Sequence, residues 1–128
     1  MATIRIGVMI MADAAIFLGW GQVVRGREAK ALQVFNESMV YYAKLQAAGT
    51  IESFEPVLLN PHGGDLAGFL LIRGDAANLE ALKQTEDFRT LLVRSQLIAD
   101  NVGVIDAAIG ATLAQGMVTY AAQIALLA

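Results

Sequence analysis

Residues 51–75 constrain the fold of this chain more than any other segment. Two apolar runs, residues 51–59 and 66–73, favour β-strands and flank the polar stretch 60–65. That stretch is built of Asn, Pro, His, Gly and Asp, which are residue types that form turns. The segment therefore predicts a β-hairpin.

A helical pattern lies on each side of the hairpin, with a further strand beyond it. Residues 27–48 lack Gly and Pro, and their apolar side chains recur at steps of three and four residues, at Leu32, Phe35, Met39 and Tyr42. This spacing predicts an amphipathic helix that ends at Gly49. Before it, residues 15–24 combine β-branched and aromatic residues with Gly19 and Gly21, which predicts a buried strand whose backbone approaches another segment closely.

The helical pattern after the hairpin is interrupted. Asp75 is a candidate N-cap for a helix that carries Leu79 and Leu82, and Thr85 is a candidate N-cap for a second helix. In the second helix the positions at core-facing spacing are Phe88, Leu91, Leu92 and Ser95. Residues 102–109 then predict a fourth strand, and the Ala-rich residues 111–127 predict a terminal helix.

This order of elements resembles the ferredoxin-like fold, an α+β fold (βαββαβ) whose antiparallel sheet has the strand order four-one-three-two. The second strand of that sheet lies at an edge. Pro56 falls in the second predicted strand and cannot donate a ladder hydrogen bond, so it independently favours an edge position. Right-handed crossovers place both helical segments on one face, and the opposite face of an apolar sheet then lacks a cover. The terminal helix is an addition to this fold.

Composition favours one domain that associates with itself. The length of 128 residues is typical of a single domain, and we treat residues 1–128 as one. The apolar share of 56% and the charged share of 16% compare with roughly 45–50% and about 25% in soluble domains. A small monomer buries such an excess poorly, so we expect a homodimer through the open sheet face.

Charge and cysteine content exclude several kinds of partner and chemistry. The net charge of −3, without a basic cluster, argues against nucleic acid. The absence of cysteine excludes disulfides, thiolate metal sites and thiol nucleophiles.

The N-terminal segment has some features of a targeting signal. Arg5 precedes an apolar run at residues 6–12, but that run is short for a secretory signal and ends at Asp13. A membrane span requires about 20 apolar residues, and polar positions interrupt the segment before that length. We expect a cytoplasmic protein without membrane contact. Met11 is an alternative start, and residues 1–14 are treated as an N-terminal extension.

The chain also resembles the dimeric α+β barrel superfamily, in which two ferredoxin-like sheets pair face to face. The resemblance covers residues 15–109 and rests on the element order together with the helix break at residues 85–88, Thr-Glu-Asp-Phe. Within the superfamily the chain is similar to small uncharacterised bacterial proteins. These carry a Gly-Arg-Glu segment, here residues 26–28, and a Pro-His-Gly-Gly-Asp-Leu turn, here residues 61–66. The superfamily includes cofactor-independent monooxygenases, haem-degrading enzymes, dehalogenases, isomerases and members without known activity, so the fold selects no function.

Four residues are candidates for ligand binding: Trp20, Glu55, Arg73 and His62. Trp20 shares a strand face with Ile16 and Leu18, and we expect that face to line an apolar cavity between paired sheets. An aromatic residue in a strand more often packs in a core or interface, however. Glu55 on the open face would become a general base if buried, whereas an edge-strand charge that discourages aggregation is the simpler explanation.

The other two candidates also have simpler explanations. Arg73 ends the third strand, where it would meet a carboxylate or an anionic ligand, or emerge into solvent. His62 is the only histidine, so a His-based metal site would have to combine it with Asp65 or glutamates. A solvated turn residue explains His62 more simply. We expect no metal and no cofactor.

Two functional classes stay open. The first is a binding protein for a small hydrophobic molecule, or an assembly module, with an apolar cavity on the barrel side of each sheet. The second is a cofactor-independent monooxygenase or isomerase that acts on an aromatic or quinone-like substrate. The enzyme requires a closed pocket in which Trp20 meets a buried Glu55, Arg73 or His62.

Overall fold

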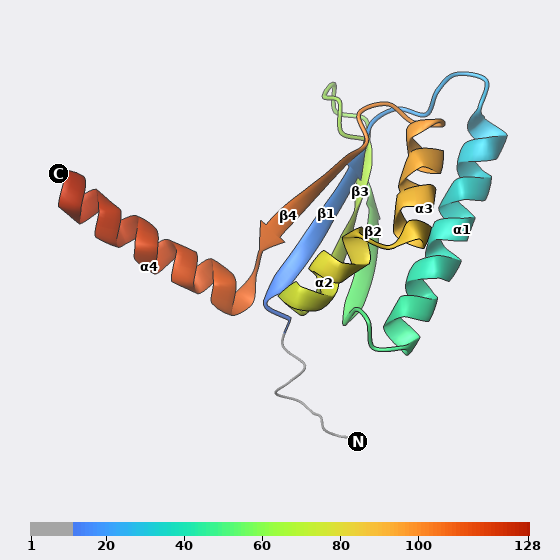
Figure 1. Ribbon diagram of the computed structural model, residues 1–128. Coiled ribbons are helices and arrows are strands. Elements are labelled where there is room, and N and C mark those ends of the chain that lie inside the picture. Colours follow the sequence, from blue (N-terminus) through green and yellow to red (C-terminus); the bar gives the residue numbers. More distant parts are fainter. Residues whose placement is uncertain (1–11) are drawn as a thin grey trace.

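A computed structural model describes residues 12–128 and contains the predicted α+β architecture (Figure 1). The alternative start at Met11 and nearly all of the N-terminal apolar run lie outside the described residues. The elements in chain order are β1 (Ala14–Trp20), α1 (Glu28–Ala47), β2 (Ser53–Leu58), β3 (Gly68–Gly74), α2 (Ala76–Lys83), α3 (Glu86–Gln96), β4 (Gly103–Ala108) and α4 (Gly110–Leu127).

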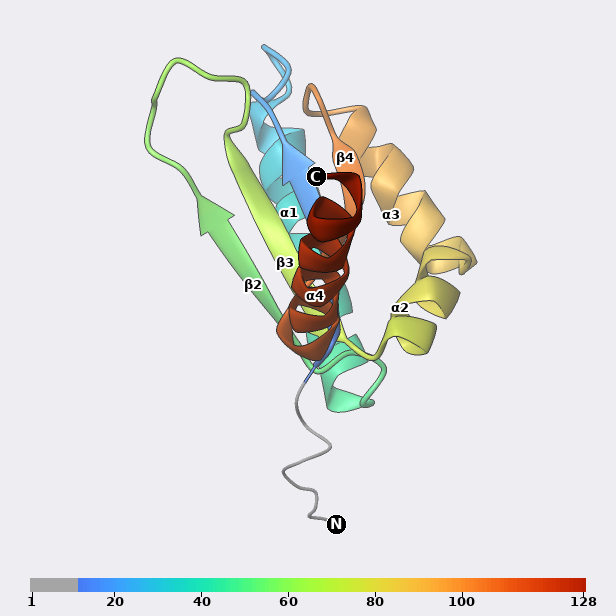
Figure 2. The ribbon, with the colours of Figure 1, turned by 90° about the vertical axis from the view of Figure 1, so that its left-hand side faces the viewer.

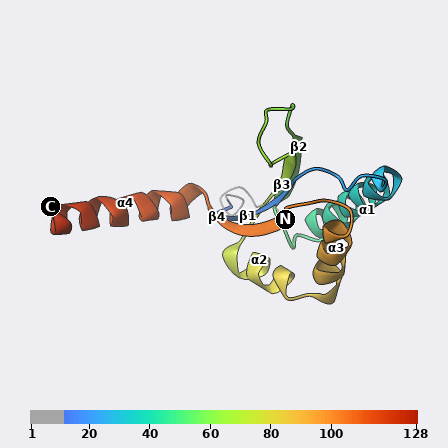
Figure 3. The ribbon, with the colours of Figure 1, turned by 90° about the horizontal axis from the view of Figure 1, so that it is seen from above.

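The four strands form one antiparallel sheet in the order β2-β3-β1-β4, which confirms the ferredoxin-like order. The hairpin of β2 and β3 is present, and Pro56 lies in the edge strand β2 opposite Leu70 of β3. Helices α1, α2 and α3 all cover the same face of the sheet (Figure 3). Among residues 12–128, the opposite face of the sheet therefore has no helix packed on it, as predicted.

Local capping explains where the helices begin and end. The Asp75 carboxylate accepts a hydrogen bond from the backbone N–H of Asn78 at 3.2 Å, and α2 starts there. The Thr85 hydroxyl accepts one from the N–H of Phe88 at 3.3 Å and starts α3. Both predicted caps of the broken helix are confirmed. Helix α1 stops before Gly49, whose φ of 79° favours glycine.

The core lies between the sheet and the three covering helices. Ile16 of β1 and Ile72 of β3 are directly paired and fully buried at its centre. Around them pack Leu18, Tyr42, Ile51, Leu70, Leu79, Leu82 and Phe88. Because side chains alternate along a strand, the even-numbered residues of β1 and β3 face the helices and the odd-numbered ones face the open side.

Strand β1 ends at Trp20, four residues earlier than the sequence pattern predicts. Its backbone then runs against two other segments, because a Cβ atom on Gly21 would lie 2.9 Å from the carbonyl oxygen of Asp100 and 3.0 Å from that of Asp65. The predicted close backbone approach is confirmed at this glycine. Beyond it only Val23 forms a further bridge, to Ala99.

Helix α4 is confirmed as a helix, but it does not pack against the sheet or the helices formed by residues 12–108. It leaves β4 on the open side of the sheet and extends away from it (Figures 1 and 3). None of its residues is buried. Seen from the open side, α4 stands in front of the sheet between the viewer and the strands (Figure 2). Within residues 12–128, no helix has the length and apolar character needed to cross a membrane.

Candidate functional site

An apolar cavity of about 390 Å³ lies between the sheet and the helices α1 and α3. Strands β1 and β3 form its floor with Leu18 and Leu70, and the two helices form its walls with Phe35, Met39, Leu91 and Leu92. Its mouth lies beside the edge strand, where Leu32 of α1 and Leu58 of β2 are 63% and 72% exposed. The volume falls within the range of roughly 300–1,000 Å³ that small-molecule sites occupy.

Trp20 lines this cavity from the end of β1. Its indole lies over Gly68, its pairing partner in β3, because a Cβ atom there would stand 2.8 Å from the Cζ2 atom of Trp20. The same Cβ atom would stand 2.8 Å from the backbone oxygen of Val57. A glycine at position 68 is thus what allows the ring to lie flat against the sheet.

Tyr42 lies deep in the cavity wall and is only 2% exposed. Its ring centroid lies 5.0 Å from that of Tyr41, in an edge-to-face arrangement, and 5.9 Å from that of Phe54. Among residues 12–128 no hydrogen-bond partner of the Tyr42 hydroxyl is present. Burial raises the pKa of this hydroxyl strongly, and the neighbouring Tyr41 adds to the effect. A buried hydroxyl without a hydrogen-bond partner costs free energy, and a ligand that reached it would relieve that cost.

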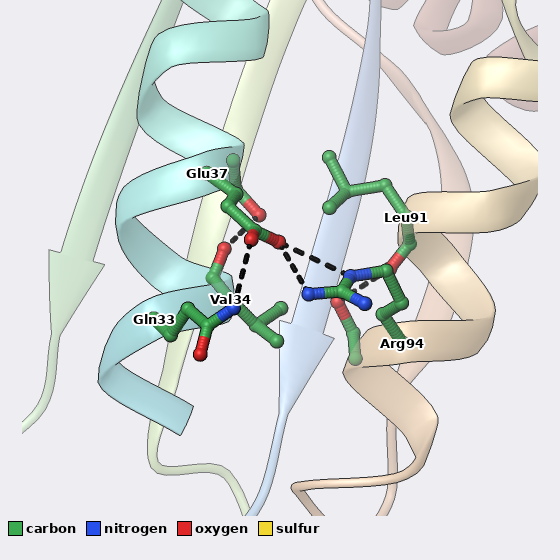
Figure 4. Close-up of polar contacts among 7 residues, drawn as sticks. Gln33, Val34, Glu37, Leu91 and Arg94 are labelled. Carbon is green, nitrogen blue, oxygen red and sulfur yellow. Dashed lines mark hydrogen bonds and ion pairs between the residues drawn. The ribbon is translucent and has the colours of Figure 1, made fainter. Parts of the chain in front are cut away.

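Two serines line the cavity without offering a free proton. Ser38 of α1 donates to the carbonyl of Val34 at 2.8 Å, and Ser95 of α3 donates to that of Leu91 at 2.9 Å. Both bonds stay within their own helix (Figure 4). Because serine side chains are small, they leave space between the two helices that larger residues would fill.

An ion pair holds α1 and α3 together on the outer side of the cavity. Arg94 of α3 donates through two nitrogens to one carboxylate oxygen of Glu37, at 2.7 and 3.1 Å (Figure 4). Gln33 donates to the other oxygen at 3.1 Å. Hydrogen bonds from Gln33 and from Arg94 hold the pKa of Glu37 below its usual range. The carboxylate therefore stays charged and bridges the helices.

Glu55 and Arg73 lie on the open face of the sheet, opposite to Trp20. Their side chains form an ion pair at 3.2 Å, and both are partly exposed to solvent. Beside them Phe17 and Phe69 stack with ring centroids 4.8 Å apart. The open face is thus apolar in its centre and carries one compensated charge pair at its β2 edge.

His62 lies in the exposed hairpin loop and takes part neither in the cavity lining nor in the ion pair of Glu55 and Arg73. Its Nδ1 accepts a hydrogen bond from the N–H of Gly64 at 3.2 Å, so the proton is on Nε2. That nitrogen lies 2.6 Å from the carbonyl oxygen of Leu66 and donates to it. The ring organises the loop, as a turn residue does.

The structure does not bring the four candidate residues together. Trp20 faces the helices with Ile16 and Leu18, so the expectation that this face lines a cavity between sheets is wrong. The sequence is ambiguous here because both alternating faces of β1 are apolar. Within residues 12–128 no group of three or more His, Asp or Glu side chains is arranged to hold a metal ion.

Sequence reasoning found some of the cavity residues and missed others. The helical spacing identified Met39, Tyr42, Leu91, Leu92 and Ser95 as facing inward, and they line the cavity. Ser38 was missed, although it lies one helical turn before Tyr42 on the same face of α1.

The fold is shared with solved structures of low sequence identity. One is a dimeric protein of unknown function and ferredoxin-like fold from Bacteroides fragilis, with a TM-score of 0.55 and 11% identity, covering 75% of this chain and 96% of that one. This chain has the ferredoxin-like fold. Another is SnoaB, a cofactor-independent oxygenase from Streptomyces nogalater, with a TM-score of 0.51 and 17% identity, covering 80% of this chain and 98% of that one. No protein-family model matches the sequence, and no curated protein is significantly similar to it.

Proposed function

We propose that this protein is a homodimer that binds a small, uncharged, largely apolar molecule in the cavity between α1, α3 and the sheet. The observation that carries the proposal is the cavity of about 390 Å³ with apolar walls. Among residues 12–128, Glu28 is the only charged residue that lines it, and it lies at the start of α1. A charged ligand would lose its hydration there without gaining a partner deeper in the cavity.

The polar groups of the cavity define the ligand further. Tyr42, a cavity-lining residue, is the proposed hydrogen-bonding group for the ligand, and Trp20 supplies an aromatic surface. A planar apolar molecule with one hydrogen-bonding group fits this arrangement.

The dimer is proposed from the apolar open face. The side chains of Phe17, Phe69, Leu71 and Ile105 lie together on it, and no helix of the described chain covers them. The relative from Bacteroides fragilis is dimeric, which supports the same state here.

Fluorescence of N-phenyl-1-naphthylamine, an apolar dye, tests the binding site. We expect saturable binding to the wild type and at least tenfold weaker binding to Ser38→Met, whose longer side chain fills the cavity. Asn36→Met is the matched control, because Asn36 lies on the outer surface of the same helix. Equal affinity of the two variants would contradict the proposed site.

A cofactor-independent oxygenase or isomerase acting on an aromatic or quinone-like substrate is the second candidate. The observation that favours it is the presence of Trp20 and Tyr42 in one cavity, together with the fold shared with SnoaB. None of Glu55, Arg73 and His62 lines that cavity, so the acid–base groups that the enzyme requires are not assembled there. Oxygen consumption with an aromatic or quinone-like compound, lost in Tyr42→Phe, would favour the enzyme.

A further inference from the structure

The apolar cavity is longer than it is wide. On α1 its lining side chains include one stripe that starts with Leu32 at the mouth, continues with Phe35 and Met39 and ends with Tyr42. Tyr42 lies ten residues after Leu32, which is about 15 Å along the helix at a rise of about 1.5 Å per residue. The volume of about 390 Å³, spread over that length, leaves a mean cross-section of roughly 26 Å².

Exposure to solvent decreases along this stripe. Leu32 is 63% exposed, Phe35 and Met39 are partly buried, and Tyr42 is 2% exposed. Leu70 and Phe88 pack in one cluster with Tyr42 and are each 3% exposed. The cavity is therefore open at the Leu32 end and closed at the Tyr42 end.

The ion pair between α1 and α3 limits the width of the cavity. Glu37 lies midway between Leu32 and Tyr42 on α1, and Arg94 donates to it at 2.7 Å from α3 (Figure 4). The residues that follow these two in the sequence, Ser38 and Ser95, line the cavity. Because the ion pair fixes the spacing of the helices at mid-length, the cavity stays narrow there.

One extended alkyl chain fits these dimensions. Non-bonded carbon atoms approach to about 3.5–4.0 Å, so one such chain fills a cross-section of roughly 20 Å². A carbon–carbon bond of about 1.52 Å advances an extended chain by about 1.25 Å, so about 15 Å holds about 12 carbons. The extended chain is a planar zigzag, and this shape lies well against the flat ring of Trp20. A compact ring of the same number of carbons is too wide.

Tyr42 favours a hydrogen-bond acceptor on the ligand. Burial raises the pKa of its hydroxyl, which therefore keeps its proton. A carbonyl oxygen accepts that proton and brings no donor of its own. A ligand hydroxyl would bring a second proton into an apolar end of the cavity, where leaving it without an acceptor costs free energy.

We propose that the ligand is an unbranched aliphatic carbonyl compound of about 12 carbons, whose carbonyl end lies at Tyr42 and whose apolar tail extends towards Leu32. The proposal rests on the proposed function, because it requires the cavity to be the binding site and Tyr42 to be its hydrogen-bonding group.

Displacement of bound N-phenyl-1-naphthylamine by two ketones tests the shape. 2-Dodecanone and cyclododecanone have the same number of carbons and the same functional group, but one is a chain and the other a ring. We expect half-displacement of the dye at a concentration at least tenfold lower for 2-dodecanone. Equal potency, or displacement by neither ketone, would overturn the elongated ligand and leave the cavity as a dye site. Absence of saturable dye binding to the wild type would overturn the proposed function itself.

Chain length tests the closed end. Affinity should rise roughly fourfold per methylene from 2-octanone to 2-dodecanone, because each added group is buried. It should stop rising between 2-dodecanone and 2-hexadecanone, whose additional carbons remain outside the mouth. A rise at the same rate up to 2-hexadecanone would overturn the length assigned to the cavity.

The carbonyl end is tested with 2-methyl-1-dodecene, in which a methylene group replaces the ketone oxygen of 2-dodecanone. The ratio of the affinities for the ketone and the alkene should fall at least fivefold from the wild type to Tyr42→Phe. Tyr120→Phe, on the exposed helix α4, is the matched control and should keep the wild-type ratio. An unchanged ratio in Tyr42→Phe would overturn the placement of the carbonyl at Tyr42.

Discussion

The rings of Phe17 and Phe69 stack at a centroid distance of 4.8 Å on the sheet face opposite to α1, α2 and α3. The two residues belong to neighbouring strands, and Phe17 is also paired with Ile105 of β4. A Cβ atom on Gly19 would lie 2.7 Å from the Phe17 ring, so the ring lies flat along its own strand. This flat aromatic surface is the part of the open face best suited to meet a copy of itself.

Phe69→Lys is therefore expected to weaken the homodimer. A lysine at the centre of a paired sheet face would be desolvated, and the loss of an aromatic anchor there costs about 2 kcal/mol or more. Light scattering after size exclusion at micromolar concentration measures the mass. Val93→Lys is the matched control, because Val93 is an exposed apolar residue on α3 at the helical side. Dimers of unchanged stability in both variants would refute an interface on the open face.

Gly68→Ala is expected to displace the Trp20 ring. The added methyl group would lie 2.8 Å from the ring and 2.8 Å from the backbone oxygen of Val57, which cannot move aside easily. Overpacking of this kind costs about 1–3 kcal/mol of unfolding free energy. The fluorescence of the single tryptophan and the urea midpoint report both effects.

Gly103→Ala is the control for that substitution. Gly103 also lies in a strand, but nothing lies within 4 Å of a Cβ atom there. We expect its tryptophan spectrum and its urea midpoint to match those of the wild type. If the tryptophan spectrum and the urea midpoint change equally in Gly68→Ala and Gly103→Ala, the cause is the loss of a strand glycine in general. The space that Gly68 leaves for Trp20 would then not be the cause.

Alkaline unfolding is expected to depend on Tyr42. Its pKa is raised in the folded state by burial, while in the unfolded chain it ionises near its ordinary value of about 10. Above about pH 10 the unfolded state has lost a proton that the folded state keeps, so unfolding becomes easier by about 1.4 kcal/mol per pH unit. Below that pH the stabilisation is fully present.

Tyr42→Phe should remove this dependence. Urea midpoints between pH 8 and pH 11 would fall less steeply in Tyr42→Phe than in the wild type. The neutral-pH midpoint should stay equal or rise, because the substitution removes no hydrogen bond to residues 12–128. Tyr120→Phe is the control, since Tyr120 lies exposed on α4. If the pH dependence of Tyr42→Phe is that of the wild type, the assignment to Tyr42 fails.

The ion pair of Glu37 and Arg94 is expected to control how tightly α1 and α3 enclose the cavity. The pKa of Glu37 is lowered in the folded state. The stabilisation by the ion pair is therefore fully present above the ordinary carboxyl pKa and is lost as the pH falls through the lowered pKa. Glu37→Gln should accelerate dye dissociation at pH 7, with little change in the urea midpoint. The charge swap Glu37→Arg with Arg94→Glu should restore the rate; a swap no better than Glu37→Gln would assign the effect to something other than the pair.

The elements of the fold were predictable because local signals agree with its topology. Asp75 and Thr85 form the caps that their residue types favour, and Pro56 lies in the edge strand. The choice of sheet face was not predictable, because Ile16, Phe17 and Leu18 are consecutive apolar residues and alternation cannot rank them. The face assignment of Trp20 failed for that reason.

The cavity and the course of α4 depend on distances that no local pattern contains. The space between α1 and α3 follows from the small side chains of Ser38 and Ser95 and from the ion pair that fixes the helix spacing. The direction of α4 follows from the turn at Gly110, whose φ of 55° favours glycine. Sequence spacing identified the helix but not the side on which it leaves the sheet.

Intermolecular nuclear Overhauser effects between N-phenyl-1-naphthylamine and the protein would locate the bound ligand. If the ligand site is the cavity between the helices and the sheet, the dye protons will show contacts to Tyr42, Leu70 and Leu92. Contacts to Phe17, Leu71 and Ile105 would instead place the dye on the open face and contradict the claim.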